Sequence, residues 1–380
     1  MTKQKQPVIA VIGGGFGGLA CLIELRRFAP DAKSHLIDTN LHFVEKTRLH
    51  ETLHRSIDHY RVPFFRLAEH HGFKFHHAKV DLSQFSSDQK QAFTDAQSLL
   101  LTSIDCPDES QTLSFDYLVV ATGSSTKPII APQPKLHTLG SLFQHQGRDL
   151  LSDFFASTSA ANPEVAIVGA GATGVQFAFA LADAAKDRSR PLQITLIDQA
   201  ARPMPTLPEA CSDYVLRQMR TNGMHYLAKH TVLDFDGDQL SLHDIDNDQP
   251  KQLPVDWAWV FTGIKAQPLV LNTNDCGQVL NGTQVIKQIY ACGDCAIYEH
   301  MTAGQQTAQA ATQQGKHIAW NISQQISSAP VTPFEVNQRG YLVSLGRCDG
   351  CGWVKSESNV VNGWPAAALK KTIEARDRLY

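Results

Sequence analysis

Two stretches of the chain, residues 6–23 and 165–182, run for 18 positions each without a charged side chain. That length is the lower limit for a helix that crosses a membrane. Glycines interrupt both stretches, however, and no small-residue cleavage site follows the first one, so neither a membrane span nor a signal peptide fits the pattern. In each stretch we instead predict a buried strand, a glycine turn and a helix.

The first stretch opens a longer pattern. A strand over residues 8–12 leads into Gly13-x-Gly15-x-x-Gly18, a helix follows, and a second strand, "SHLID", ends in Asp38, 25 residues after Gly13. Gly13 permits a tight turn, Gly15 lets a pyrophosphate approach the backbone, and Gly18 lets the helix pack closely on the strand. The helix N-terminus offers free N–H groups to phosphates, and Asp38 offers a carboxylate to a ribose. The pattern predicts a dinucleotide site.

The second stretch repeats the pattern. It contains Gly169-x-Gly171-x-x-Gly174, and the strand after its helix ends in Asp198, 29 residues after Gly169. The alternative for either copy is a glycine-rich turn between strand and helix that binds nothing. Two such sites in one chain suggest electron transfer between two cofactors. A carboxylate at Asp198 would repel a 2′-phosphate, so we expect NADH to be preferred over NADPH.

Two further segments belong to the pattern. One lies between the two copies of the glycine motif, and the other follows the second copy. "FDYLVVATG", residues 115–123, is an apolar strand that ends in a small-residue turn, and "QIYACGDCA", residues 288–296, is a strand that ends in Gly293-Asp294. The order of the four segments resembles the two-dinucleotide-domain flavoproteins, the pyridine-nucleotide oxidoreductases related to glutathione reductase. The resemblance implies that the first glycine motif and the Gly293-Asp294 segment hold FAD, and that the second motif holds NAD(P)H.

The resemblance also implies a role for individual residues. Asp294 would hydrogen-bond the ribitol chain, and the helix after it would direct its N-terminus at the flavin pyrimidine edge. The residues expected at FAD are Gly13, Gly15, Phe16, Gly17, Gly18, Asp38, Lys46, Ala121, Thr122, Gly123, Gly293, Asp294 and Ala308. Those expected at NADH are Gly169, Gly171, Thr173, Gly174, Asp198 and Gly263.

A competing motif lies inside the first of these domains. The stretch "HETLH", from His50 to His54, fits the H-E-x-x-H pattern of zinc-dependent proteases, in which two histidines share a zinc ion and Glu51 activates a water. No third ligand of the extended protease pattern follows it. We therefore interpret it as a helix beside the flavin and expect no metal there. Nearby Lys46 and Arg48 could reach the flavin or its pyrophosphate, or could be solvated.

The cysteines decide which branch of the family fits. Residues 39–105 contain no cysteine, and residues 140–270 contain only Cys211, so a disulfide relay beside the flavin is not expected. Two C-x-x-C pairs remain, Cys292/Cys295 and Cys348/Cys351. They could form a four-thiolate zinc site or a redox pair, but buried free thiols are the expected state.

The segment after the Gly293-Asp294 pair resembles the type II NADH dehydrogenases. In "TAQAATQQGKHIAWNI", residues 307–322, Ala308, Gln309 and Gln313 match the A-Q-x-x-x-Q stretch that lines the quinone pocket of that family. Gln309 and Gln313 share one helical face, where their amides could bind quinone carbonyls; a plain polar helix face is the alternative. The family often has Glu where this chain has Gln176, which puts a proton-relay role there in doubt.

Composition narrows the choice of partners. The chain has 380 residues, a net charge of −3 and eight cysteines, which favours a reducing, cytoplasmic location and excludes a nucleic-acid partner. The final stretch, "WPAAALKKTIEARDRLY", predicts a helix with Leu369, Ile373 and Tyr380 on one side and basic residues around it, Arg378 among them. Such a helix could lie on the inner face of the cell membrane or pack on its own domain. The sequence leaves the oligomeric state undecided, and a homodimer is one possibility.

These observations predict an α/β fold with two doubly wound domains. We expect a split FAD domain in residues 1–140 and 270–325, an NADH domain in residues 141–269 and a small C-terminal α+β part in residues 326–380 that covers the flavin. The expected enzyme is an FAD-dependent NADH dehydrogenase with a quinone as acceptor. The alternatives are an NAD(P)H reductase of a small iron–sulfur protein and a non-catalytic redox sensor related to apoptosis-inducing factor.

Overall fold

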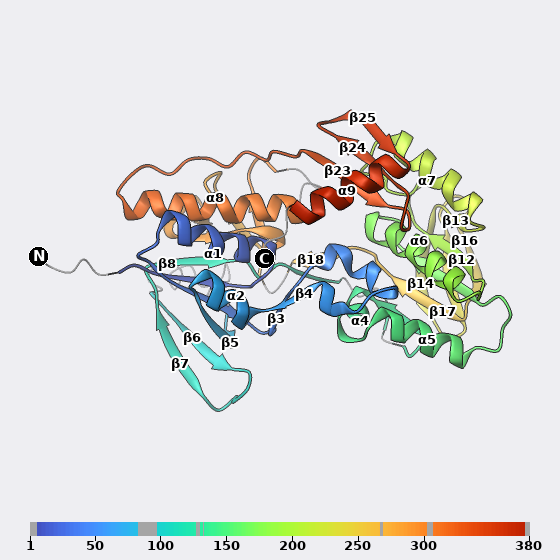
Figure 1. The fold of residues 1–380 in the computed structure, drawn as a ribbon, viewed down its shortest axis with the longest axis horizontal. Coiled ribbons are helices and arrows are strands. Elements are labelled where there is room, and N and C mark those ends of the chain that lie inside the picture. The colour runs from blue at the N-terminus through green and yellow to red at the C-terminus, as the bar shows by residue number, and fades with distance from the viewer. Residues whose placement is uncertain are drawn as a thin grey trace, which may run out of the picture.

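The computed structural model describes residues 6–82, 97–126, 130–131, 133–266, 269–301 and 307–376. Its larger sheet has ten strands, and the central ones, β21, β8, β1, β2 and β5, are parallel (Figure 1). In spatial order the strands are β22 (Ala296–Tyr298), β19 (Leu271–Thr273), β20 (Gln278–Asn281), β21 (Gln284–Ala291), β8 (Tyr117–Val120), β1 (Val8–Ile12), β2 (Lys33–Asp38), β5 (Lys74–Val80), β6 (Ser98–Ser103) and β7 (Ser110–Ser114). Early and late segments of the chain thus share one sheet.

Two long helices pack together over this sheet, and a short one lies beside them (Figure 1). They are α1 (Phe16–Phe28), α8 (Ala308–Ile326) and α2 (Phe64–His71). The axes of α1 and α8 approach closely because glycines face each other at their crossing. A Cβ on Gly315 would lie 2.0 Å from the carbonyl oxygen of Gly17. The buried residues of α1 and β1, such as Leu22 and Val11, form one core beneath these helices.

The smaller main sheet has five parallel strands. They are β10 (Leu136–Thr138), β17 (Trp257–Val260), β11 (Glu164–Val168), β12 (Gln193–Ile197) and β13 (His225–Leu227). The helices around it are α4 (Leu139–Gln144), α5 (Gly147–Ser157), α6 (Ala172–Asp187) and α7 (Glu209–Thr221). An antiparallel sheet of β14 (His230–Phe235), β15 (Gln239–Asp244) and β16 (Gln249–Pro254) follows β13 in the chain. The two main sheets meet at a ribbon of β9 (Ser124–Thr126) and β18 (Ile264–Ala266).

The two uncharged stretches form the predicted strand, turn and helix. Residues 6–23 contain β1 and the first half of α1, and residues 165–182 contain most of β11 and α6. Within the described part of the chain, no helix is both long enough and apolar enough to cross a membrane. The structure is the predicted α/β fold with two main sheets, whose central strands are parallel.

The segment that contains HETLH lies between the two main sheets. It forms a 3-10 helix, η1 (Lys46–Leu53), flanked by β3 (His42–Val44), η2 (Ile57–His59) and β4 (Arg61–Pro63). This segment packs against α4, α5 and α6 of the second sheet's domain. Leu49 and Leu53 share one hydrophobic core with Phe177 of α6 and with Val343 near the C-terminus. One core therefore joins segments from three parts of the chain.

The C-terminal part starts with residues 329–339, here called the strap, which run back along α8 (Figure 1). The Asn321 side chain exchanges hydrogen bonds with the backbone of Thr332 at 2.9 and 3.0 Å. The strap leads to an antiparallel sheet and a last helix: β23 (Gly340–Ser344), β24 (Gly350–Val354), β25 (Ser356–Asn362) and α9 (Trp364–Arg376). This sheet packs on α6 and α7. Arg378 and Tyr380 of the predicted last helix lie outside the described residues.

Candidate functional site

The first glycine motif forms a backbone cradle between β1 and α1. Gly13 has φ +98°, and a Cβ there would lie 2.3 Å from the carbonyl oxygen of Ala121. A Cβ on Gly18 would lie 2.0 Å from the oxygen of Gly13. Gly15, by contrast, faces open space and caps α1 without a side-chain hydrogen bond. The first N–H groups of α1 are thus accessible to a phosphate.

The second motif reproduces this cradle between β11 and α6. Gly169 has φ +101°, and a Cβ there would lie 2.4 Å from the carbonyl oxygen of Phe261. A Cβ on Gly174 would lie 1.9 Å from the oxygen of Gly169, while Gly171 again faces open space at the N-terminus of α6. The two copies are therefore equivalent in backbone geometry as well as in sequence.

The aspartate that ends the second strand of each motif accepts a hydrogen bond from the glycine loop of the same motif. Asp38 accepts a 2.6 Å hydrogen bond from the N–H of Gly14, and Asp198 accepts one of 2.6 Å from the N–H of Ala170. The second oxygen of Asp198 accepts from the N–H of Ala200 at 2.8 Å. Each carboxylate is therefore fixed beside its cradle, where a carboxylate can accept from ribose hydroxyls. Recognition of a ribose by Asp38 and Asp198 stays a prediction.

A threonine lies opposite each cradle, in the turn after a neighbouring strand. Thr122 follows β8 and Thr262 follows β17, and both hydroxyl oxygens are buried without a hydrogen-bond partner among the described residues. The next residue in each turn is a glycine with positive φ, Gly123 at +71° and Gly263 at +96°. Buried hydroxyls normally have partners, so these two fit a polar ligand held between cradle and turn. The residues present fit two dinucleotides.

The Gly293-Asp294 pair lies in a 3-10 turn, η4 (Gly293–Cys295), after β21. The hydroxyl of Ser124 donates a 2.5 Å hydrogen bond to one oxygen of Asp294. The buried side chain of Gln314 on α8 accepts from the N–H of Gly293 at 2.8 Å. Ser124 and Gln314 thus hold this turn between the first sheet and α8. Sequence reasoning missed both residues, although each directly follows a predicted site residue.

The remaining predicted residues differ in how accessible they are. Lys46 is exposed at the start of η1, and Gln309 is half-buried near the start of α8. The Gln313 amide donates to the carbonyl oxygen of Asn337 at 2.9 Å and accepts from its N–H at 3.1 Å. Gln176 is buried and accepts from the N–H of Ser344 at 3.3 Å. Gln313 therefore holds the strap against α8, and Gln176 holds the C-terminal sheet against α6, in addition to any role at the acceptor site.

The HETLH side chains have partners within the protein. Glu51 accepts hydrogen bonds from Arg48 at 2.8 and 3.0 Å and from the Tyr60 hydroxyl at 2.9 Å. Burial acts to raise the pKa of Glu51, but Arg48 outweighs this effect and lowers the pKa to about 2. A carboxylate with so low a pKa is a weak base for activating water. Arg48 is buried, so it is not the solvated cation that the sequence allowed.

The two histidines of the motif lie in different surroundings. His50 is buried, and burial together with nearby Lys370 lowers its pKa to about 3. The ring of His54 points to the helix α6, where its Nε2 lies 3.0 Å from the carbonyl oxygen of Ala180. Within the described residues, no group of three or more His, Cys, Asp or Glu side chains is placed to hold a metal ion. The segment joins domains in this structure.

The four cysteines of the C-x-x-C pairs do not converge. Cys292 and Cys295 are buried in the cores of the larger sheet, whereas Cys351 is buried in the core that contains α6 and α7. All four are free thiols. Cys348 is exposed, which corrects the expectation that all four would be buried. A shared four-thiolate site is therefore incompatible with this fold.

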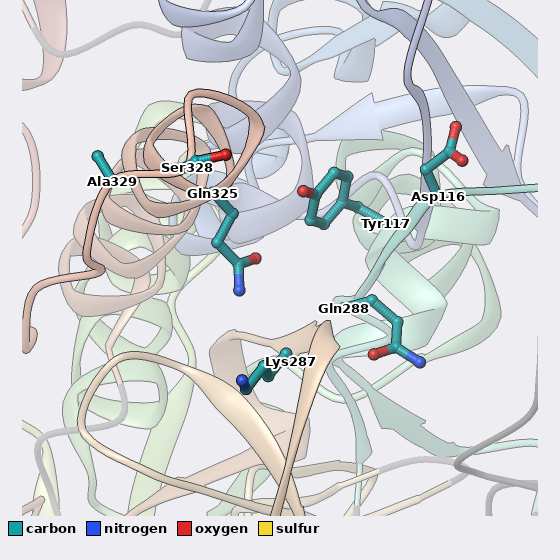
Figure 2. Close-up of a pocket in the computed structure, with 7 residues that line it drawn as sticks. All are labelled: Asp116, Tyr117, Lys287, Gln288, Gln325, Ser328 and Ala329. Carbon is teal, nitrogen blue, oxygen red and sulfur yellow. The ribbon is translucent and has the colours of Figure 1, made fainter. Parts of the chain in front are cut away.

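Figure 2 shows a cavity, of about 400 Å³, whose lining includes no residue of either glycine motif. Its lining includes Asp116 and Tyr117, at the amino end of β8, and Gln325, near the end of α8. The cradles lie at the carboxyl ends of β1 and β11, the edge at which open α/β sheets bind their ligands. The cavity is therefore separate from the predicted cofactor sites.

Comparison with known proteins identifies the class. The sequence model of the pyridine nucleotide-disulphide oxidoreductases matches residues 7–315, and the chain belongs to this family. The match includes both glycine motifs, the two threonine turns and the Gly293-Asp294 turn. It confirms the family predicted from the sequence, and with it FAD and NAD(H) as the cofactors.

Individual relatives match along almost the whole chain. The demethylphylloquinone reductase NdbB of Synechocystis sp. is 28% identical, over 98% of this chain and 92% of its own length. The type II NADH:quinone oxidoreductase of Staphylococcus saprophyticus is 24% identical, over 99% of this chain and 96% of its own. Among solved structures, NDH2 from Plasmodium falciparum in complex with NADH superimposes with a TM-score of 0.80 at 15% identity, covering 98% of this chain and 94% of that one. At that identity the structural match shows a shared fold.

Proposed function

We propose that this protein is an FAD-dependent NADH dehydrogenase that delivers electrons to a quinone. The observation that carries the proposal is the pair of equivalent cradles, each with a fixed carboxylate and a facing threonine, in one chain. When bound, the flavin supplies the redox chemistry, since it accepts a hydride from NADH and passes two electrons to an acceptor. The protein supplies binding, orientation and electrostatics.

The residues divide into two binding sites by their neighbours. The first cradle lies in the same sheet as the Gly293-Asp294 turn, and Ser124 donates to one of the two carboxylate oxygens of Asp294. These features suit the longer dinucleotide, FAD. The second cradle has Asp198 beside it and would orient NADH, with the N-terminus of α6 at the pyrophosphate. On this assignment residues 1–140 with 270–325, and 141–269, are the proposed cofactor domains, although β10 (Leu136–Thr138) already belongs to the second sheet.

The quinone is proposed from the relatives and from one helix. The curated relatives named above act on quinones by their names, and they align over nearly the full chain. The first two turns of α8 contain Ala308, Gln309 and Gln313. The Gln313 side chain is already hydrogen-bonded to the backbone of Asn337. The half-buried Gln309 is therefore the better candidate for a hydrogen bond to a quinone carbonyl.

A lipid quinone requires access to a membrane surface. We place the protein on the cytoplasmic face of the cell membrane as a peripheral protein. Trp364, at the start of α9, is 74% exposed, and an exposed tryptophan suits the headgroup region of a bilayer. Lys371 lies on the same helix as Trp364, and its ammonium group donates a hydrogen bond to the carbonyl oxygen of Arg347. A homodimer stays a proposal that size-exclusion chromatography with light scattering tests.

The test begins with the purified full-length protein. We expect a flavin absorbance spectrum, bleaching of that spectrum by NADH, and rapid NADH oxidation with soluble ubiquinone and menaquinone analogues. A ferredoxin serves as the one-electron comparison. Faster turnover with ferredoxin than with every quinone would favour the iron–sulfur reductase, and turnover near zero with every acceptor would favour the redox sensor. A protein that contains no flavin and takes none up would refute the cofactor assignment.

A further inference from the structure

The Asp294 side chain is tied to the strand that follows the first threonine turn. The hydroxyl of Ser124 donates to Asp294 Oδ2 at 2.5 Å. A hydrogen bond from a hydroxyl to an ionised carboxylate typically measures about 2.5–2.7 Å, so this is a bond of the stronger kind. Ser124 is the first residue of β9 and lies two residues after Thr122. The bond therefore joins two of the segments that are expected at FAD.

The backbone that carries Asp294 is fixed independently of this bond. Gly293 has φ +75°, and its N–H donates at 2.8 Å to Oε1 of Gln314, a side chain that is only 2% exposed. The freedom that remains is in the torsions of the Asp294 side chain. The last torsion of an aspartate has broad preferences of its own, so a hydrogen bond decides the direction of the carboxylate plane. In this structure that bond comes from Ser124.

The backbone that carries Ser124 is held by a strand from the other side of the ribbon. β9 pairs with β18, and Ser124 lies opposite Ala266 in the register. β9 directly follows Gly123 of the first threonine turn, and β18 directly follows Gly263 of the second one. The turn η4, which contains Asp294, also packs against β18. A strand that continues from the second cofactor domain therefore supports the Ser124–Asp294 bond.

We propose that Ser124 is a positioning residue for FAD, whose hydroxyl directs the Asp294 carboxylate at the hydroxyl groups of the ribityl chain. The inference rests on the proposed assignment of the first cradle and the Gly293-Asp294 turn to FAD. Because Ser124 holds Oδ2, the carboxylate plane is set before the cofactor binds. An acceptor that is already oriented loses less conformational entropy on binding than one that rotates freely. Ser124 thus increases the affinity for FAD through Asp294.

The test measures the release of FAD from the purified full-length holoenzyme and does not depend on turnover. Flavin fluorescence after dilution gives the dissociation constant of FAD. We expect Ser124→Ala to raise this constant by about tenfold, as for the loss of one hydrogen bond to a charged group. Ser124→Thr keeps the hydroxyl and suits a strand, so its constant should stay within about threefold of the wild type. Ser125→Ala is the matched control, because successive side chains of a strand point to opposite faces, and it should leave the constant unchanged.

A double-mutant cycle shows whether Ser124 acts through Asp294. In the Asp294→Ala background, Ser124→Ala should change the dissociation constant by less than about twofold, because the carboxylate that it orients is gone. Additive effects of the two substitutions would overturn the proposal, and so would a Ser124→Ala variant that retains FAD as tightly as the wild type. A Ser124→Thr variant as weak as Ser124→Ala would do the same. A wild type that binds no FAD would instead contradict the proposed function, so the two failures have different signatures.

Discussion

Gly315 of α8 contacts Gly17 of α1 through backbone alone, so that a Cβ at position 315 would lie 2.0 Å from the carbonyl oxygen of Gly17. The contact sets the distance between the helix that follows the first glycine motif and the helix that follows the Gly293-Asp294 turn. A Cβ on Gly17 would in turn lie 2.8 Å from the Cys292 sulfur. The geometry of the proposed FAD site therefore depends on two positions that carry no functional group.

We expect Gly315→Ala to separate the two helices and to weaken flavin retention. Overpacking of this kind costs about 1–3 kcal/mol, and here the obstacle is backbone, which cannot rotate away. The free energy of unfolding from urea titration and the flavin-to-protein absorbance ratio measure the two effects. Gly140→Ala on α4 is the matched control, because its nearest neighbour is a side-chain oxygen at 3.3 Å. Equal behaviour of the two variants would contradict the assignment.

Arg48→Met should destabilise the protein strongly. The Arg48 side chain is 10% exposed and forms ion pairs with Glu45 at 3.3 Å and Glu51 at 2.8 Å. Removal of one member of a buried pair costs about 3–5 kcal/mol, because the remaining charge stays desolvated. Arg148→Met, at a side chain 48% exposed with an ion pair at 3.6 Å, should change the free energy of unfolding by less than about 1 kcal/mol. Chemical denaturation compares the two variants.

Acid should destabilise the protein below pH 6.5 through three buried or half-buried histidines. Burial lowers the pKa of His50 from 6.5 to about 3, and lowers those of His76 and His137 to about 4. Below pH 6.5 the unfolded chain therefore binds protons that the native protein does not, so stability falls as the pH falls toward the native pKa values. Glu51 adds to this loss between pH 4.5 and about 2, since its pKa is also lowered.

His50→Asn tests this pH dependence. We expect the slope of the unfolding free energy between pH 6 and 4.5 to decrease by up to about 1.4 kcal/mol per pH unit. His300→Asn is the control, because that side chain is 78% exposed. The measurement is urea denaturation at a series of pH values. A slope that stays the same in the His50 variant would show that another group accounts for the acid sensitivity.

Gln309→Ala should slow electron delivery to quinones and leave flavin reduction by NADH unchanged. Stopped-flow absorbance separates the two half-reactions. Gln313→Ala should additionally loosen the strap, because it removes both hydrogen bonds to Asn337. Gln324→Ala, on the same helix but at its other end, serves as the control and should alter neither half-reaction. Equal slowing of both half-reactions in Gln309→Ala would show that this residue does not act on the acceptor side.

Asp198→Asn should narrow the preference for NADH over NADPH. We expect the wild type to prefer NADH by about tenfold to a hundredfold in kcat/KM, which corresponds to about 1.4–2.8 kcal/mol. The asparagine keeps one oxygen for the N–H of Ala170 but removes the charge that repels a 2′-phosphate. Asp38→Asn, the equivalent change in the first cradle, should leave the preference intact. An unchanged ratio of the two coenzymes in Asp198→Asn would show that the residue only anchors its loop.

The parts of the site that depend on local backbone geometry were predictable from the sequence. Gly13 and Gly169 have φ values near +100°, and a Cβ on either residue would lie within 2.4 Å of a neighbouring carbonyl oxygen, conditions that only glycine meets. Their spacing relative to Asp38 and Asp198 therefore indicated both cradles, and with them the fold. The family resemblance added the assignment of one cradle to each cofactor.

The parts that depend on long-range pairing were not predictable. Whether Glu51 serves a metal or an arginine depends on the fold around η1, and Arg48 also pairs with Glu374, far along the chain. Helical spacing suggested that Gln313 faces a quinone, but the strap that binds it has no periodic pattern to reveal its path.

The hydrophobic core that joins η1, α6 and the C-terminal sheet limits how this protein could be re-engineered. Leu49 and Leu53, Phe177, and Val343 come from segments that a coenzyme-domain exchange would take from different parents. A chimera that replaced residues 141–269 alone would bring an unmatched surface against Leu53 and Val343. A change of coenzyme in this protein is therefore better sought by point substitution within the second cradle than by transplanting a module.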